Sequence, residues 1–163
     1  MIKVYAKDRH VTKIQKFLNS MNFDNKIYTI YSDSSSDNEQ FDLGISYGYN
    51  RKITDPLLST PKKGFVNFHP APLPEYKGNL GMLRAIENKV MRWGVTCHFM
   101  DNSIDTGDII KVKYFDLHER PTSTDELSAI SHYFMFSLFK EIIPKIITGN
   151  IQQIPQINYK SEL

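Results

Sequence analysis

Length, composition and charge indicate one globular unit and exclude several classes of protein. The chain has 163 residues, of which 40% are hydrophobic, enough to bury one sizeable core but few for two full domains. Its 20 basic and 18 acidic residues are scattered along the chain and give a net charge of +2, so no nucleic-acid-binding patch stands out. The only cysteine, Cys97, excludes an intrachain disulfide and a cysteine-based zinc site.

The amino-terminal residues predict neither export nor membrane insertion. Met1–Ala6 lack the long apolar h-region of a signal peptide, and no run approaches the roughly 18 apolar residues of a membrane span. The low cysteine content also fits a reducing compartment. We therefore expect a cytoplasmic protein with one domain over residues 1–150 and a tail over residues 151–163.

The first half of the chain alternates strand and helix patterns. The strand patterns lie, in chain order, at residues 2–6, 26–31, 41–47 and 64–68. Apolar residues recur at helical spacing between Val11 and Met21, which predicts a βαβ opening. A Ser- and Asp-rich loop is expected at residues 32–40, and a short helix at residues 55–60.

The second half predicts a change in strand direction. After a helix at residues 79–88, strands at residues 93–100 and 109–115 flank a short loop and read as antiparallel partners. The predicted fold is therefore a Rossmann-like open twisted α/β sheet, mostly parallel with an antiparallel edge, and with helices on both faces. Cys97 and His98 are adjacent on a strand, so they point to opposite faces and do not form a metal pair.

The last long element is an amphipathic helix. Ser123 and Glu126 form a capping-box pattern, and apolar residues from Leu127 to Ile143 cover most of the helix surface that follows. Pro144 is expected to kink or end the helix, and Gly149 is expected to stop it before the tail. The tail itself is predicted to have no fixed structure.

The first strand-to-helix turn excludes one common function of such folds. A dinucleotide-binding βαβ unit needs glycines in this turn so that the backbone can approach a pyrophosphate. The turn here is Lys7-Asp8-Arg9-His10, without glycine. A nicotinamide or flavin cofactor is therefore not indicated.

Two central loops carry the candidate chemistry. Asn67 and His69 lie two positions apart at a predicted strand end, where open α/β sheets bind ligands, and Asp105 lies in a Gly-marked loop farther on. An amide, an imidazole and a carboxylate suit acyl transfer. Each element also has a plainer interpretation: a structural histidine, a rigid connector at Pro70–Pro74, and a hairpin turn at Asp105–Asp108.

Taken together, these loops resemble a known family. The segments Phe65–Gly78 and Gly94–Ile110, with an interval of thirty-six positions from His69 to Asp105, closely resemble the folate-dependent formyltransferases. The resemblance is detailed from about Phe41 to Phe115. It implies transfer of a formyl group from the co-substrate 10-formyltetrahydrofolate to a primary amine, without a metal.

The resemblance assigns a role to each residue of the catalytic set. The Asn67 amide would donate to the tetrahedral oxyanion, an interaction on the order of 3 kcal/mol. His69 would either take the proton of the attacking amine or donate to the oxyanion when charged, and the sequence does not separate these roles. Asp105 would orient the imidazole and stabilise its cationic form.

Two further groups of residues are assigned to binding, the first of them from the resemblance alone. The folate slot is assigned to two loop segments, with the cofactor-binding residues Tyr49, Arg51, Ile53, Met100, Asp101, Asn102, Ser103 and Ile104. Acceptor contacts are assigned to the loop after the proline run, with Tyr76, Lys77 and Asn79, for which a solvated loop is an equal alternative.

Sequence differences between branches of the family indicate which acceptor to expect. Glycinamide ribonucleotide transformylases have a glycine-rich loop at the position of Lys7–His10, and methionyl-tRNA formyltransferases usually have Gly-Ser-Leu-Leu-Pro where this chain has Pro70–Pro74. The form of the latter segment, with Ser46–Tyr49 and Arg51–Ile53, is most similar to the sugar N-formyltransferases. The expected acceptor is a nucleotide-linked amino-deoxysugar, such as a dTDP-linked 4-amino-4,6-dideoxyhexose.

Several alternatives remain open at this stage. Within enzymes, the same residues could hydrolyse formyltetrahydrofolate or formylate glycinamide ribonucleotide. In another class, the chain would be a folate- or nucleotide-binding module without catalysis. The expected partner is a small nucleotide-sugar substrate, with no nucleic acid and no membrane, and a homodimer is left open.

Overall fold

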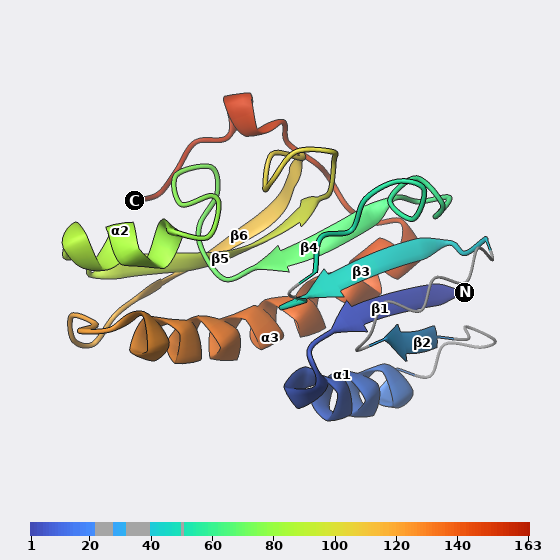
Figure 1. Cartoon of the computed structure of the whole chain (residues 1–163), viewed down its shortest axis with the longest axis horizontal. Coiled ribbons are helices and arrows are strands. Elements are labelled where there is room, and N and C mark those ends of the chain that lie inside the picture. The colour runs from blue at the N-terminus through green and yellow to red at the C-terminus, as the bar shows by residue number, and fades with distance from the viewer. Residues whose placement is uncertain (22–27, 32–39, 50) are drawn as a thin grey trace. The chain divides into compact units, whose positions relative to one another are not determined.

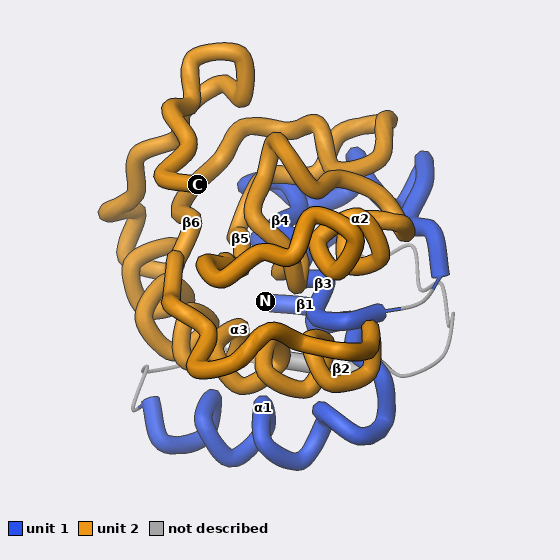
Figure 2. Tube along the Cα trace, turned by 90° about the vertical axis from the view of Figure 1, so that its left-hand side faces the viewer, with its two compact units in different colours: residues 1–67 blue, residues 68–163 orange. Residues whose placement is uncertain are grey.

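The computed structural model describes residues 1–21, 28–31, 40–49 and 51–163 (Figure 1). These residues form two compact units, Met1–Asn67 (unit 1) and Phe68–Leu163 (unit 2), and the division falls inside a strand (Figure 2). One domain over residues 1–150 stays a prediction.

Unit 1 opens with the predicted βαβ arrangement. Strand β1, Ile2–Ala6, pairs in parallel with β2, Tyr28–Tyr31, and with β3, Leu43–Tyr47. Every residue of β1 and β3 is buried, as is usual for parallel strands covered on both faces. The strand order is β2-β1-β3, with β4, Phe65–His69, beside β3. Residues 26–27 of the second predicted strand and residues 32–39 of the predicted loop lie outside the described residues.

Helix α1, Asp8–Ser20, covers part of unit 1 with one apolar stripe. His10, Ile14 and Leu18 follow each other at four-residue spacing and are all buried. The His10 ring meets the Tyr47 ring edge to face, with 5.2 Å between centroids. The helix begins at Asp8, inside the glycine-free segment Lys7–His10, and contains the residues with helical spacing in the sequence.

The short helix predicted over residues 55–60 is wrong. The segment forms successive turns, in which the Leu58 N–H donates to the Thr54 carbonyl (3.1 Å) and the Thr60 N–H to the Leu57 carbonyl (3.2 Å). The Ser59 and Thr60 hydroxyls both donate to the Pro56 carbonyl, at 3.1 and 2.8 Å. Such side-chain bonds compete with the helical backbone pattern, which explains the difference.

Unit 2 contains the antiparallel edge that the sequence predicts. Its strands follow the order β4-β5-β6, in which β5, Arg92–Phe99, and β6, Ile109–Asp116, are antiparallel with Val95 opposite Lys113. Helix α2, Gly81–Glu87, precedes β5. The fold is thus an open mixed α/β sheet with parallel strands and an antiparallel edge, as predicted. Both faces of β5 are buried, including its polar residues Thr96 and His98.

Helix α3, Thr124–Thr148, begins at the predicted cap and continues past Pro144. The Ser123 hydroxyl accepts the Glu126 N–H at 3.2 Å. Pro144 lies inside the helix and does not end it. Ile142, Ile143, Ile146 and Ile147 are all buried around it, and burial of these side chains offsets the one backbone hydrogen bond that proline removes.

The helix ends where the sequence predicts. Gly149 adopts the left-handed conformation at φ 76°, which glycine takes without strain, and its N–H donates to the Ile146 carbonyl at 3.1 Å. Within the described ranges, no helix combines the length and the apolar character needed to cross a bilayer.

The tail has more structure than the sequence predicts. Ile154 and Ile109 exchange both backbone hydrogen bonds at 2.8 Å, which adds an isolated bridge to the start of β6. A 3₁₀ turn, Gln156–Asn158, follows, and Tyr159 packs against a cluster of Leu73, Ile109 and Val112. The alternation that identifies longer strands is absent from so short a pairing, so the sequence gives no signal for it.

Candidate active site

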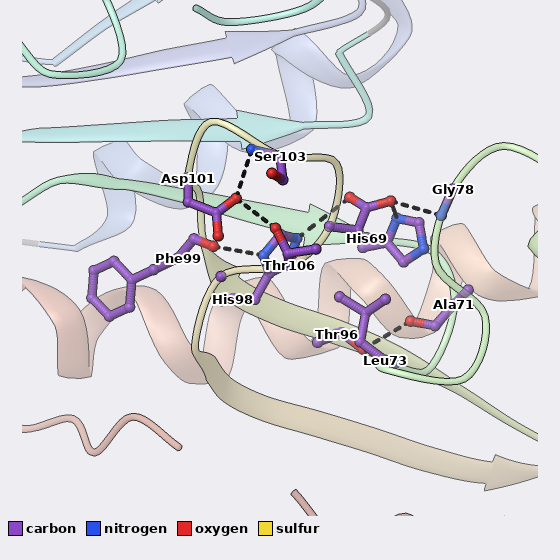
Figure 3. Close-up of polar contacts among 12 residues, drawn as sticks. His69, Ala71, Leu73, Gly78, Thr96, His98, Phe99, Asp101, Ser103 and Thr106 are labelled. Atoms are coloured by element: carbon purple, nitrogen blue, oxygen red, sulfur yellow. Dashed lines mark hydrogen bonds and ion pairs between the residues drawn. The ribbon is translucent and has the colours of Figure 1, made fainter. Parts of the chain in front are cut away.

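The proline-rich segment after β4 is held in place by one buried hydroxyl. Thr96 on β5 is fully buried, donates to the Ala71 carbonyl at 2.8 Å, and accepts the Leu73 N–H at 3.0 Å. Pro70, Pro72 and Pro74 lack a backbone N–H group. The backbone hydrogen bonds to Thr96 therefore come from Ala71 and Leu73, the residues between these prolines. Thr96 thereby fixes the segment that directly follows His69, the last residue of β4 (Figure 3).

The loop between β5 and β6 is held by its own side chains. The Asp101 carboxylate accepts the Ser103 N–H at 3.0 Å and the Thr106 hydroxyl at 2.7 Å. Gly107 packs so closely that an added Cβ would lie 2.0 Å from the Phe99 carbonyl oxygen. Asp105 sits between these contacts with a left-handed φ of 55°, a conformation that aspartate tolerates better than most residues.

His69 and Asp105, predicted from separate loops, meet in unit 2. His69 Nδ1 lies 3.5 Å from Asp105 Oδ2, and the two side chains are 11% and 12% exposed. The Gly78 N–H donates to the same carboxylate oxygen at 3.0 Å (Figure 3). Two of the three predicted catalytic residues therefore share one small, largely buried site.

Both nitrogens of His69 face oxygen atoms. Nε2 lies 3.1 Å from the Tyr76 carbonyl, which can only accept a hydrogen bond, and Nδ1 faces the Asp105 carboxylate. The ring can donate to both oxygens only when both nitrogens carry hydrogen. The site thus provides a natural partner on each side for a protonated imidazole.

A second histidine completes the site, and the sequence analysis missed it. His98 Nε2 lies 3.7 Å from Asp105 Oδ1, on the side of the carboxylate away from His69, and the two imidazole centroids are 6.5 Å apart. His98 is 2% exposed, and its Nδ1–H donates to the Phe99 carbonyl at 2.7 Å. The available signal was a lone imidazole on a buried strand that leads directly into the Asp105 loop.

Burial keeps His98 uncharged. Loss of solvent and, second, the positive charge of a protonated His69 lower the pKa of His98, while Asp105, the Phe99 carbonyl and Asp101 oppose the shift only in part, and the net result is a pKa of about 4. A neutral His98 that donates through Nδ1 presents a lone pair at Nε2. The carboxylate is therefore flanked by one neutral ring and one ring that can accept a proton.

Asn67 lies on the same strand as His69 but belongs to unit 1. It is partly exposed, as is His69, whereas Val66 and Phe68 between and beside them are buried. This alternation is that of a strand in which residues two apart share a face. The role of Asn67 as oxyanion donor stays a prediction.

The predicted folate residues differ in their surroundings. In unit 1, Tyr49 meets the Tyr5 ring edge to face at 5.7 Å, Arg51 is exposed, and Ile53 is buried at 5% exposure. In unit 2, Met100 is partly buried. The loop residues after it, which are open to solvent, are Asp101, Asn102, Ser103 and Ile104.

The predicted acceptor residues are also of two kinds. Tyr76 is nearly buried, and its ring packs on Trp93 at 4.7 Å, so its side chain supports the core while its carbonyl meets His69. Lys77 and Asn79 are exposed in the following turn. Among the described residues, no group of three or more His, Cys, Asp or Glu side chains is arranged to hold a metal ion.

Comparison with characterised proteins gives one consistent family. Residues 8–134 match the family described as formyl transferase. A methionyl-tRNA formyltransferase of Staphylococcus aureus (strain JH1) is 30% identical over 118 residues, which are 71% of this chain and 37% of that protein. The chain therefore spans little more than a third of the length of this curated relative.

Solved structures agree on the fold. The formyltransferase PseJ of Anoxybacillus kamchatkensis, solved with UDP-4,6-dideoxy-4-formamido-L-AltNAc and tetrahydrofolate, has a TM-score of 0.79 at 26% identity, over 99% of this chain and 84% of that chain. The phosphoribosylglycinamide formyltransferase of Streptococcus pneumoniae TIGR4 has a TM-score of 0.69 at 22% identity, over 90% and 98%. With a family match that includes His69, His98 and Asp105 and covers most of its length, the chain belongs to the formyl transferase family.

Proposed function

We propose that this chain transfers a formyl group from 10-formyltetrahydrofolate to the primary amine of a nucleotide-linked amino-deoxysugar. The observation that carries the transfer is the His69–Asp105 pair, 3.5 Å apart and largely shielded from water, at the end of β4. Family membership supports the same chemistry.

The reaction needs a proton to move from the amine to the departing folate nitrogen. The amine nitrogen attacks the formyl carbon, a tetrahedral intermediate forms, and the bond from that carbon to N10 of the folate breaks to give tetrahydrofolate and a formamide. His69 is the group that takes the amine proton or, when charged, donates to the oxyanion. Its two nitrogens lie against the Tyr76 carbonyl and the Asp105 carboxylate, which orient the ring for either role.

Asp105 makes this role of His69 efficient in two ways. Its carboxylate orients the ring through Nδ1, and its negative charge stabilises the imidazolium in a site that little water reaches. The Gly78 N–H holds the shared oxygen in position. Asn67, two residues before His69 on β4, is proposed as the donor to the oxyanion.

The folate donor is proposed to bind beside this pair. The exposed loop Asp101–Ile104 leads into Asp105, so a pterin held by its backbone would lie next to the reacting carbon. Tyr49, Arg51, Ile53 and Met100 are proposed as further folate contacts. For Ile53 the burial favours support of the slot over direct contact.

The acceptor assignment rests on sequence form and on one neighbour. The segment Pro70–Tyr76 has the form typical of sugar N-formyltransferases, and the neighbour solved with a formamido sugar nucleotide aligns with 99% of this chain. Lys77 and Asn79, both exposed after this segment, are proposed to contact the acceptor. A homodimer remains a prediction.

The methionyl-tRNA acceptor is the second candidate. It is favoured by the 30% identity to the S. aureus enzyme. The near-balanced charge of this chain, +2, offers less attraction for a polyanion than a basic domain would.

A panel of acceptors tests the proposal directly. The chain is incubated with 10-formyltetrahydrofolate and, separately, with dTDP- and UDP-linked 3- and 4-amino-deoxysugars, methionyl-tRNA, glycinamide ribonucleotide or no amine, and product mass is recorded. A mass increase of one formyl group on an amino-sugar nucleotide supports the proposal. Formylation of methionyl-tRNA or glycinamide ribonucleotide alone would replace the acceptor.

Two further outcomes would replace the reaction itself. Tetrahydrofolate released at full rate without any amine would identify a hydrolase. If folate binds and the low background turnover is the same in His69→Asn, the chain is a binding module without catalysis.

A further inference from the structure

The tail contributes one side chain to the loop that carries Asp105. Gln156 Nε2 donates to the Asp105 carbonyl and to the Gly107 carbonyl, each at 2.9 Å. A glutamine amide has two hydrogens, so both bonds form at the same time. We propose that Gln156 is a positioning residue that holds the Asp105 carboxylate against His69, an inference that rests on the proposed formyl transfer.

The loop needs such support at this point. Asp105 has a left-handed φ of 55°, a conformation disfavoured for a residue with a Cβ. The backbone conformation at Asp105 sets the direction of its side chain. Without Gln156, the Asp105 and Gly107 carbonyls would lose the donor that bridges them. By bridging both carbonyls, one amide fixes the peptide units that follow Asp105 and Gly107, and so the backbone on the carboxyl-terminal side of the residue whose carboxylate faces His69.

The tail is anchored well enough for this task. Ile154 exchanges two backbone hydrogen bonds of 2.8 Å with Ile109, the first residue of β6. The 3₁₀ turn that starts at Gln156 and the packing of Tyr159 hold the segment on the other side. Gln156 therefore reaches the loop from a fixed base, which a freely moving tail would not provide.

The test replaces the amide with an acceptor of the same size. Gln156→Glu puts a carboxylate oxygen against the two carbonyls and removes both donors, and Gln156→Met removes them without charge. Gln153→Glu is the matched control, since Gln153 is exposed in the same tail and undergoes the same change in charge. Both Gln156 variants are expected to lower kcat on the order of tenfold, with KM for the folate donor within about twofold of wild type.

A second readout does not depend on activity. The Gly78 N–H donates to the Asp105 carboxylate, so its amide exchange with solvent, followed by NMR, reports whether that carboxylate stays in place. Exchange at Gly78 is expected to rise on the order of tenfold in Gln156→Met and to stay unchanged in Gln153→Glu.

The outcomes separate the two proposals. A lower Tm with kcat and Gly78 exchange unchanged in both Gln156 variants would overturn the positioning role and leave a structural one. If Gln156→Glu does not fold, Gln156→Met decides by the same criteria. Faster Gly78 exchange in a chain that formylates no acceptor would support the positioning role and refute the proposed function.

Discussion

Two groups of ionisable side chains in unit 2 differ in how much water reaches them. The site cluster, His69, His98 and Asp105, is 2–12% exposed, whereas Glu141 and the lysines around it are 29–49% exposed. This lysine cluster, with Lys111, Lys113 and Lys145, has more formal charge. Its charges are solvated, so removal of one is expected to matter little, while in the site cluster each proton and each charge affects its neighbours.

Removal of the site imidazole should have the largest effect. His69→Asn keeps a polar side chain but no group that can carry the proton, so kcat/KM for formyl transfer is expected to fall roughly 10²- to 10⁴-fold. The measurement is initial rates of tetrahydrofolate formation with saturating acceptor. His118→Asn is the control, because His118 is exposed in the same unit. Equal activity of the two variants would remove His69 from the mechanism.

Loss of the carboxylate charge should come next. Asp105→Asn keeps an oxygen for the Gly78 N–H but no longer stabilises a charged His69, so kcat is expected to fall on the order of a hundredfold. Asp116→Asn, at a carboxylate 78% exposed, provides the matched control. If both variants retain wild-type kcat, the contrast between buried and exposed charge does not apply to the reaction.

The residues in and around the site cluster show how much could be predicted from the sequence. His69 and Asp105 lie in distinctive loops with a family-specific interval, so the sequence marks both as candidates, and the structure brings their side chains together. His98 was missed because its neighbours on β5 are apolar and its importance arises only when the β5–β6 loop folds back beside it. Gln156 was missed because glutamine in a polar tail has no pattern of its own.

The fold shows the same division. Strands and helices with long, periodic burial were predicted to within a few residues, and the antiparallel edge was predicted correctly. The chain departs from simple sequence rules for two reasons, burial of neighbouring side chains and local side-chain hydrogen bonds. Pro144 is retained inside α3 because four isoleucines around it are buried, and the 55–60 segment forms turns because its hydroxyls bond to the Pro56 carbonyl.

The pH dependence of stability should sharpen the comparison. In the unfolded chain His98 takes a proton at its ordinary pKa near 6.5, while burial lowers the folded pKa to about 4, so the unfolded state binds more protons between these values. The unfolding free energy is therefore expected to decrease as pH falls from about 6.5 to about 4, by a few kcal/mol.

Urea unfolding at several pH values across this window measures the effect. His98→Gln should flatten the slope, because it removes the group that titrates, and His118→Gln should leave it unchanged. A slope in His98→Gln equal to that of wild type would show that other groups cause the loss of stability.

The smallest effect is expected in the lysine cluster. Burial raises the pKa of Glu141, but the hydrogen bond and charge of Lys111, together with Lys113 and Lys145, outweigh it and hold the pKa below its usual range. The stabilisation is thus present above the unfolded pKa and is lost as pH falls through the folded one. Because solvent screens these partners, Glu141→Gln is expected to cost about 1 kcal/mol or less at pH 7 and to leave kcat unchanged.

Urea unfolding at low and high salt checks this prediction, since any difference between Glu141→Gln and wild type should shrink as salt is added. A tenfold loss of kcat in this variant would mean that the exposed charges take part in turnover.

The lack of space at Gly107 sets a limit on redesign of this protein. A methyl group at this position would overlap the Phe99 carbonyl, so laboratory evolution of new acceptor preferences should recover no substitution there, however permissive the screen. Diversity is better directed at Lys77 and Asn79, which are exposed and proposed to contact the acceptor. The turn at Gly107 would then keep its shape while the acceptor contacts are varied.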